Sequence, residues 1–392
     1  MVSVLAFARK SLVRFVFGAA LLSLAACTTG PILPGAGPAT GGSGTVNVAL
    51  LVPGGSGQAS DELLARSLQN AARLAMAELN GVTINLKVYN TAGQPAQAQA
   101  MALQAADEGA QVILGPVFAQ EANAAGVGVA GRGLNVLSFS NNPDIAGGNV
   151  FVLGQTFENT ATRLARYAVR NGKSRIMIVH DSNTAGELGR AAIARGVAAA
   201  GGSVVAVGAY EFSQNGVVAA APGIVASARS TTADAVFLTA DTAGALPLIT
   251  QLLRDNGLDT EATRLIGLTR WDIPAATVAL PGVQGGWFAL PDPALYSQYQ
   301  SRYQAAYGEA PHPISGLAYD GIAAIGALAK RGQSGALAAS ALTQGAGFVG
   351  VNGIFRLRSD GTNERGLAVA QVRNSQVVVI DPAPRSFGGA GF

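Results

Sequence analysis

Residues 46–80 read VNVALLVPGGSGQASDELLARSLQNAARLAMAELN and set the pattern for the chain. The first seven residues predict a buried strand, and PGGSGQ at 53–58 predicts a Gly-rich loop. Residues 60–80 predict a helix, because apolar residues recur there at helical spacing and the segment ends in Asn80 and Gly81. A strand, a loop and a helix in this order form one unit of an α/β fold.

The same alternation continues to residue 270. Further strands are predicted at 84–90, 112–115, 135–140, 149–156, 175–181, 204–212, 235–241 and 264–270, with helices between them near 95–108, 120–131, 157–171, 185–200, 217–229 and 243–256. Such alternation predicts two doubly wound halves, each with a parallel sheet covered on both faces. Residues 353–381 instead predict an antiparallel meander that closes one lobe, with turns at Asp360-Gly361 and Asn374-Ser375.

The first 26 residues predict a lipoprotein signal peptide. Three basic residues precede an apolar run at 15–26, and LAAC at 24–27 resembles the lipobox of bacterial lipoproteins. This resemblance implies that Cys27 is lipidated and becomes the first residue of the mature chain. The alternative is an ordinary signal peptide that is cut nearby. Residues 27–45 are rich in Gly and Pro and predict a flexible tether.

Composition excludes several classes of function. A chain of 392 residues with 49% hydrophobic and 12% charged residues can bury the cores of two domains. The net charge of +3 equals the three basic residues of the leader, so the mature chain carries 3 − 3 = 0 and gives no support for a nucleic-acid partner. Because Cys27 is the only cysteine, we expect neither disulfides nor a cysteine-bound metal.

We also expect no catalytic residue, metal or cofactor. GVGVAG at 126–131 matches the spacing of dinucleotide-binding loops, but it ends a predicted helix, whereas such a loop must follow a strand and open a helix. His180 and His312 are the only histidines, and neither has a partner at metal-ligand spacing. A hydrolase using His180 is kept only as a third class of function.

Polar loops follow the predicted strands at their carboxyl ends, where open parallel sheets bind ligands. Such loops can also be simple connections. The candidate residues of a ligand cleft are Ser56, Phe118, Ala119, Ser140, Asn141, Gln155, Asp181, Asn183, Asp241, Arg270 and Trp271. Phe118 or Trp271 is expected to stack on the ligand.

Residues 46–382 resemble a known family, and four segments carry the resemblance. In chain order they are PGGSG after the first strand, VILGP at 112–116, LSFSNNP at 137–143 and SGLAYDGIAAIGAL at 315–328. The chain resembles type I periplasmic binding proteins of the leucine/isoleucine/valine-binding class. The resemblance implies two Rossmann-like lobes joined by three crossovers, near 155, 289–291 and 345–351. Lobe 1 would contain 46–154 plus 291–345, lobe 2 would contain 155–290 plus 346–382, and 383–392 would be a disordered tail.

Two departures from that class concern residues that hold an amino acid. The sequence has Ala119 where Ser is common, and Asn141 where a small residue and a Thr precede the Pro. Loss of a hydroxyl donor from a buried carboxylate costs on the order of 1–3 kcal/mol. The aromatic residue usual in the fifth loop is replaced by Thr184 and Ala185.

A divergent branch of the same fold does not need to hold an amino acid. The sequence is similar to the penicillin-binding protein activators, Gram-negative lipoproteins that contact a peptidoglycan synthase, and Thr28 after Cys27 is compatible with outer-membrane sorting. The leading expectation is a non-enzymatic lipoprotein that faces the periplasm, is anchored by lipid in the outer membrane, and regulates peptidoglycan synthesis through contact with a penicillin-binding protein. The alternative is the solute-binding receptor of an ABC transporter for amino acids or related small molecules.

Overall fold

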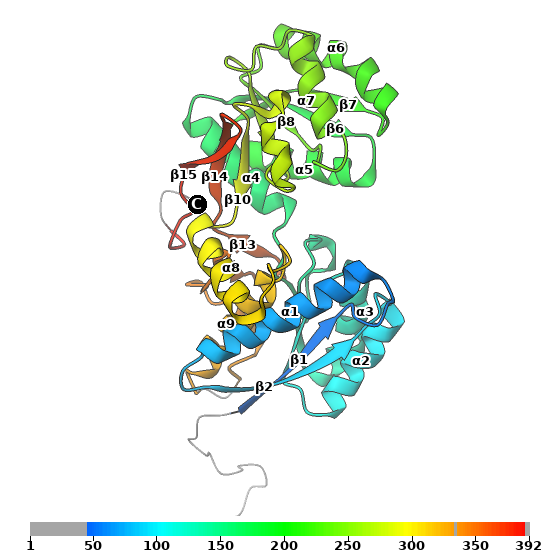
Figure 1. Cartoon of the computed structure of the whole chain (residues 1–392), viewed down its shortest axis with the longest axis vertical. Coiled ribbons are helices and arrows are strands. Elements are labelled where there is room, and N and C mark those ends of the chain that lie inside the picture. The colour runs from blue at the N-terminus through cyan, green and yellow to red at the C-terminus, as the bar shows by residue number, and fades with distance from the viewer. Residues whose placement is uncertain (1–44, 333–334, 389–392) are drawn as a thin grey trace, which may run out of the picture. The chain divides into compact units, whose positions relative to one another are not determined.

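The computed structural model describes residues 45–332 and 335–388. The predicted signal peptide, almost all of the predicted tether and Cys27 lie outside the described residues. In the described part, the strands form one sheet of five, one of seven and one of three (Figure 1). We call the five-stranded sheet with its helices lobe 1, and the seven-stranded sheet with its helices lobe 2. No helix among the described residues is long and apolar enough to cross a membrane.

Lobe 1 is built on a fully parallel sheet with the strand order β2-β1-β3-β4-β5. Successive residues of β1 enter different cores. Val48 and Leu50 pack with helices α1, α8 and α9, whereas Ala49 and Leu51 pack with α2 and α3. The elements are β1 (Thr45–Val52), α1 (Ala59–Glu78), β2 (Thr83–Asn90), α2 (Pro95–Asp107), β3 (Val112–Leu114), α3 (Ala119–Val129), η1 (Ala130–Arg132), β4 (Asn135–Ser138), η2 (Pro143–Ile145), β5 (Val150–Val152), α8 (Pro293–Tyr307), α9 (Gly316–Ala329) and α10 (Ala339–Leu342).

Lobe 2 has the strand order β15-β14-β10-β9-β8-β6-β7. Strands β6 to β10 are parallel, and β14 and β15 extend the sheet in antiparallel fashion. Helices α4 and α5 cover one face, and α6 and α7 the other. The elements are α4 (Phe157–Arg170), β6 (Arg175–Asp181), α5 (Thr184–Ala199), β7 (Ser203–Tyr210), α6 (Gln214–Ser230), β8 (Ala235–Leu238), α7 (Leu246–Asp255), β9 (Arg264–Gly267), η3 (Ala275–Ala279), η4 (Pro281–Val283), β10 (Trp287–Leu290), β14 (Ala368–Arg373) and β15 (Gln376–Asp381).

The predicted alternation of strands and helices is therefore present, and the α/β fold with two lobes is confirmed. The GVGVAG motif at 126–131 lies at the end of α3 and in η1, ahead of β4. It thus lacks the strand before it and the helix after it that a dinucleotide-binding loop needs.

The third sheet departs from the sequence prediction. It consists of β11 (Phe348–Gly350), β12 (Gly353–Leu357) and β13 (Asn363–Arg365), all antiparallel. Its apolar residues Phe348, Phe355 and Leu357 pack into the core of lobe 1, so residues 346–365 do not belong to lobe 2. The third crossover is formed by residues 366–367, between β13 and β14, instead of 345–351.

For the same reason, the predicted meander is divided between two sheets. The turn at Asp360-Gly361 connects β12 to β13, whereas the turn at Asn374-Ser375 connects β14 to β15 in lobe 2. Both residues of the second turn have positive φ, as a two-residue hairpin turn requires. Of the predicted tail, Ala383 is buried in the core of lobe 2, and 389–392 lie outside the described residues.

Candidate functional site

A cavity of about 270 Å³ lies where the chain passes between the lobes. Residues next to all three crossovers contribute to it, since its lining includes Gln155, Pro291 and Leu367. Its polar lining residues are Asn141, Gln155, Thr156, Thr160, Thr269, Arg270, Asn352 and Arg365. Its apolar lining residues are Phe157, Leu268, Ile273, Pro291, Pro313, Ile314, Leu317 and Leu367. We call this the solute cavity.

Three of the predicted cleft residues line the solute cavity. Gln155 donates from Nε2 to Thr160 Oγ1 at 2.9 Å, which fixes its amide. Arg270 donates from Nε and Nη2 to the two carboxylate oxygens of Asp272, at 2.6 and 2.5 Å. The exposed side chain of Asn141 makes no hydrogen bond to another described residue, so its amide is available to a ligand.

A buried ion pair builds the wall of the cavity on the side of the third crossover. Asp320 of α9 accepts from the Val351 N–H at 2.7 Å and from Asn352 Nδ2 at 3.0 Å, and its Oδ2 lies 3.5 Å from Arg365 Nη1. Arg365 also donates from Nε to the Leu153 carbonyl at 2.8 Å. Both side chains are almost completely buried, so this network fixes the position of two polar lining residues.

Sequence reasoning missed five polar lining residues, namely Thr156, Thr160, Thr269, Asn352 and Arg365. Arg365 lies just before the third crossover, which the sequence placed about 20 residues too early, whereas Asn352 directly follows the predicted crossover at 345–351. A correct crossover would have made Arg365 a candidate, and the predicted crossover already pointed to the neighbourhood of Asn352. Thr160 is buried within α4, and nothing in the local sequence distinguishes it from a core residue.

The prediction that Trp271 stacks on a ligand is wrong. Its side chain is fully buried and stacks on Phe288, with ring centroids 6.3 Å apart and an interplanar angle of 22°. Gly267 and Gly286 make room for it, because a Cβ on either would lie 2.1 Å from the indole. Trp271 is therefore a core residue of lobe 2.

The other candidates do not line the solute cavity, and apart from Asp181 at the end of β6 they lie in loops or at helix starts. Ser56 and Ser140 accept hydrogen bonds from backbone N–H groups two residues further on, and Asn183 and Asp241 from groups three residues further on. These bonds hold turns and the start of α5 in shape. Phe118 and Ala119 form the beginning of α3.

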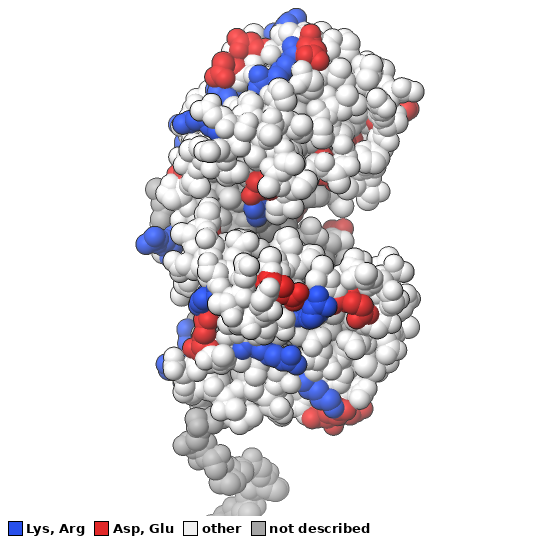
Figure 2. All heavy atoms as spheres, viewed as in Figure 1, with Lys and Arg blue, Asp and Glu red and all other residues white. Residues whose placement is uncertain are grey.

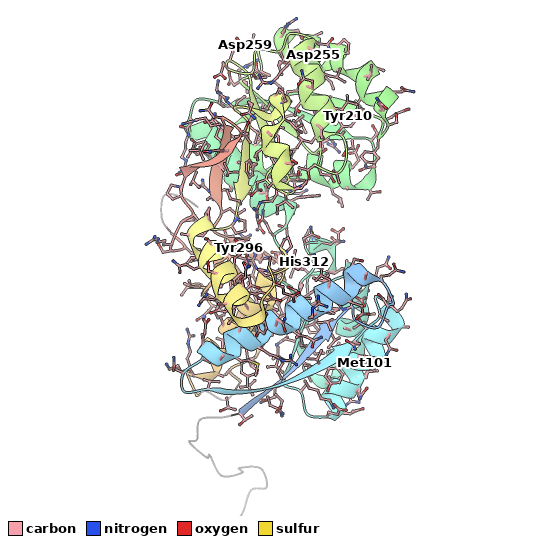
Figure 3. The ribbon with its side chains drawn as sticks, in the orientation of Figure 1. Met101, Tyr210, Asp255, Asp259, Tyr296 and His312 are labelled. Carbon is pink, nitrogen blue, oxygen red and sulfur yellow. The ribbon has the colours of Figure 1, made fainter. Side chains whose placement is uncertain are left out.

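Two buried carboxyl groups stand apart from the solute cavity. Asp181 at the end of β6 has an Oδ1 without a hydrogen-bond partner, and burial raises its pKa. Burial and the neighbouring Asp181 raise the pKa of Tyr210, which ends β7 (Figure 3). Neither carboxyl oxygen of Glu121, in the first turn of α3, has a hydrogen-bond partner, and burial raises its pKa as well.

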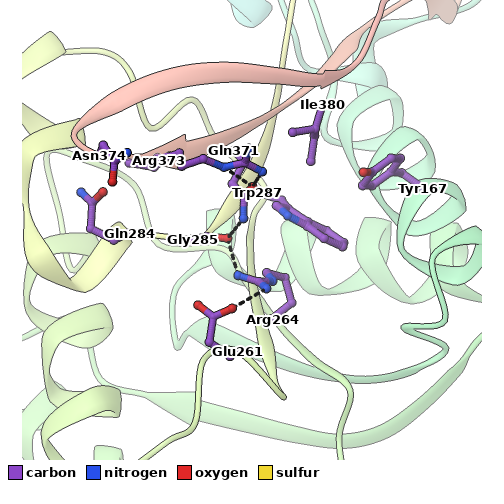
Figure 4. A pocket seen from close by; sticks show the side chains of 11 residues that line it. Tyr167, Glu261, Arg264, Gln284, Gly285, Trp287, Gln371, Arg373, Asn374 and Ile380 are labelled. Atoms are coloured by element: carbon purple, nitrogen blue, oxygen red, sulfur yellow. Dashed lines mark hydrogen bonds and ion pairs between the residues drawn. The ribbon is translucent and has the colours of Figure 1, made fainter.

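Other cavities differ from the solute cavity in their composition. One of about 440 Å³ adjoins it, shares Arg270, and extends to Tyr296 of α8, labelled in Figure 3. One of about 600 Å³ belongs to lobe 2 alone (Figure 4). There the Arg264 guanidinium lies 5.5 Å from the Trp287 ring centroid and donates to the Gly285 carbonyl at 2.7 Å. Its polar groups are thus largely bound to one another.

The described residues form neither a strongly charged patch on the face drawn in Figure 2 nor a cluster of metal ligands. On the face drawn in Figure 2, side chains of both signs are intermingled and most of the surface is uncharged. Among residues 45–332 and 335–388, no group of three or more His, Cys, Asp and Glu side chains is placed to hold a metal ion.

Comparison with known proteins identifies the family. The model of the periplasmic binding protein family matches residues 45–376, which is most of the chain. The chain belongs to this family. Among curated proteins, none matches it.

Solved structures of other family members share the fold. A branched-chain amino acid ABC transporter protein of Rhodospirillum rubrum is 19% identical with a TM-score of 0.71, over 86% of this chain and 99% of that one. An ABC transporter substrate-binding protein of Desulfitobacterium hafniense in complex with Leu is 18% identical with a TM-score of 0.64, over 86% and 100%. A solute-binding protein of Rhodopseudomonas palustris in complex with 3,4-dihydroxybenzoic acid is 18% identical with a TM-score of 0.59, over 88% and 97%.

The family assignment confirms the resemblance to type I periplasmic binding proteins. It also favours the transport alternative of the sequence analysis over its leading expectation, because these neighbours are receptors of ABC transporters. The family is one of periplasmic binding proteins, and two of these structures are described as solute- or substrate-binding proteins of ABC transporters.

Proposed function

We propose that this protein is the solute receptor of an ABC transporter and captures a small organic molecule in the solute cavity. The observation that carries the proposal is the lining of this cavity, which combines residues next to all three crossovers with an amide, on Asn141, that has no partner among the described residues. A ligand held there would contact both lobes at once. Family membership and the neighbouring transporter receptors support the same conclusion.

The lining also suggests the chemistry of the ligand. Half of the lining residues are apolar, and both arginines are already paired with carboxylates, so the cavity is close to neutral. Arg270 uses Nε and Nη2 for Asp272, which leaves Nη1 as a donor. We therefore propose a solute with an apolar body and one carboxylate, of the size of leucine or a dihydroxybenzoic acid, the ligands of two neighbours.

A thermal-shift screen of amino acids and aromatic carboxylates with the purified protein tests this proposal. A solute at 100 times its dissociation constant stabilises the folded state by about 2.7 kcal/mol. Asn141→Ala and Arg270→Gln should each weaken binding of the hit about 10-fold or more, because each removes a hydrogen bond to the solute. Arg132→Gln, which removes an exposed ion pair with Asp107, is the matched control and should bind normally. A flat screen would refute the receptor function.

A second candidate is the activator of a penicillin-binding protein, which acts by protein contact. It rests on Ala119, the first residue of α3, whose methyl group cannot replace a hydroxyl donor in gripping an amino acid. Recovery of a cell-wall synthase in a pull-down from membrane extract would support it. Recovery of none at native expression would argue against it.

In either function, we propose that Cys27 carries the lipid that anchors the protein in the outer membrane, on the basis of LAAC at 24–27. Two acyl chains hold such an anchor stably, at about 0.8 kcal/mol per buried CH₂.

A further inference from the structure

A second cavity, of about 530 Å³, shares Thr156 and Arg365 with the solute cavity and has a different composition. Five arginines line it, namely Arg163, Arg166, Arg195, Arg358 and Arg365. Three carboxylates line it as well, on Glu158, Asp360 and Glu364, and Asp381 and Asp320 outside the lining pair with Arg163 and Arg365, so the formal charge of these groups together is 5 − 5 = 0. We call it the arginine cavity.

Elements of both lobes form the walls of the arginine cavity. On α4, Asn159, Thr162, Arg163 and Arg166 follow the spacing of one helix face, and Arg195 comes from the neighbouring α5. The opposite wall is the turn between β12 and β13, which packs on lobe 1. Asn159 already donates to the Asn363 carbonyl across this boundary at 3.0 Å.

Ion pairs within the lining leave two arginines with spare donors. Arg195 pairs with Glu158, and Arg358 pairs with Glu364 at 2.9 Å. Arg163 is 5% exposed and pairs through Nη2 with Asp381, but its buried Nη1 has no hydrogen-bond partner. Arg166 is half-buried and makes neither an ion pair nor a hydrogen bond with another described residue.

An unpartnered donor on a buried guanidinium is costly, and it marks a place where a ligand atom would be stabilised. Arginine forks bind carboxylate and phosphate oxygens with two parallel hydrogen bonds. Spare donors on two arginines match a ligand that presents two anionic oxygens or more.

We propose that the arginine cavity binds a small organic dianion, either a phosphate monoester or a dicarboxylate, through Arg166 and the Nη1 group of Arg163. This site adjoins the solute cavity through Thr156 and Arg365 and does not depend on the proposed function. Hydroxyl groups of Thr156 and Thr162 add further donors around the ligand.

Isothermal titration calorimetry of the purified protein with glycerol phosphate and with succinate tests the site. Acetate at the same ionic strength serves as the monoanion control. We expect saturable binding of at least one dianion and much weaker binding of acetate, and the two titrations distinguish phosphate from dicarboxylate. Absence of saturable binding for both dianions, or equal binding of acetate, overturns the proposal.

Two variants locate the binding. Arg166→Gln should raise the dissociation constant about 10-fold or more, because a charge-assisted hydrogen bond is lost. Arg73→Gln is the matched control, since Arg73 is an exposed arginine on α1, outside the cavity, and the net charge changes equally. If Arg166→Gln impairs folding, Arg358→Gln on the opposite wall provides the same readout. A loss of affinity equal to that of Arg73→Gln would show a general charge effect and refute the site.

Discussion

Replacement of Asp320 by Asn should destabilise the whole molecule, because it leaves the buried Arg365 without its counter-ion. The Asp320 side chain is completely buried, and that of Arg365 is 3% exposed. Removing one partner of a buried ion pair costs about 3–5 kcal/mol, since an uncompensated charge remains inside the protein. In Asp320→Asn, the amide oxygen can still accept a hydrogen bond from the Val351 N–H or from Asn352 Nδ2. The expected loss of stability therefore comes chiefly from the missing negative charge.

The expected cost can be measured by urea unfolding followed by circular dichroism, together with the melting temperature. A loss of 3–5 kcal/mol corresponds to a fall in Tm of roughly 4–7 °C for a chain of this size. Asp107→Asn is the control, because it breaks only the exposed pair with Arg132 and should cost about 0–1 kcal/mol.

A double variant separates the charge effect from other losses. Asp320→Asn combined with Arg365→Gln should cost less than the sum of the two single changes, because the second change removes the stranded charge. A loss below about 1 kcal/mol in Asp320→Asn, or strict additivity in the double variant, would refute the role assigned to this pair. The single variant should also bind the solute less well, since Asn352 and Arg365 line its cavity.

Three further predictions concern other parts of the chain. The pKa of Glu121 is raised by burial, so the folded state favours the protonated form and stability falls as pH rises through that pKa. Glu121→Gln should therefore lose less stability between pH 5 and pH 8 than the parent does, and an identical pH profile of thermal unfolding would contradict this. Gly267→Ala should cost about 1–3 kcal/mol in chemical unfolding by clashing with Trp271. Gly223→Ala, where a Cβ meets open space within α6, should not destabilise, and equal losses would argue against the clash. Cys27→Ser should abolish incorporation of labelled fatty acid, and retained label would exclude lipidation at this residue.

The order of strands and helices could be predicted because the buried residues of each element form a regular apolar pattern in the sequence. In β1, every residue from Val48 to Val52 is buried, which produces the unbroken apolar run of a strand covered on both sides. The loops after the strands were recognisable by Gly, Asn and Ser. These features depend on neighbours within a few residues, so one sequence is enough to find them.

The core in which each segment or side chain packs could not be predicted in this way. The segment 353–381 has strand propensity throughout. Its sequence does not reveal that Phe355 packs in the core of lobe 1 whereas Val369 packs in the core of lobe 2. Trp271 follows Arg270 in a loop, and its burial is decided by Gly267 and Gly286 on either side of the indole.

The candidate sites illustrate the same limit. Gln155 and Asn141 were found because they lie beside a strand end of lobe 1. The Asp320–Arg365 pair joins residues 45 positions apart, and the arginine cavity joins α4 and α5 to a turn about 200 residues further on. Long-range pairing of charges leaves no periodic signal in a single sequence.

The way lobe 1 closes its core has a consequence for how the protein is made. Its first strand begins at Thr45, yet its core also requires Tyr299, Ile322 and Phe355 from the last third of the chain. The parallel part of lobe 2, from α4 to β10, is contiguous in sequence and is synthesised in between. Lobe 1 thus starts before lobe 2 and stays incomplete until most of lobe 2 is made, and the apolar face of α1 must wait for α8 and α9 through more than 200 residues of synthesis. Newly made chains would need protection from aggregation over this interval.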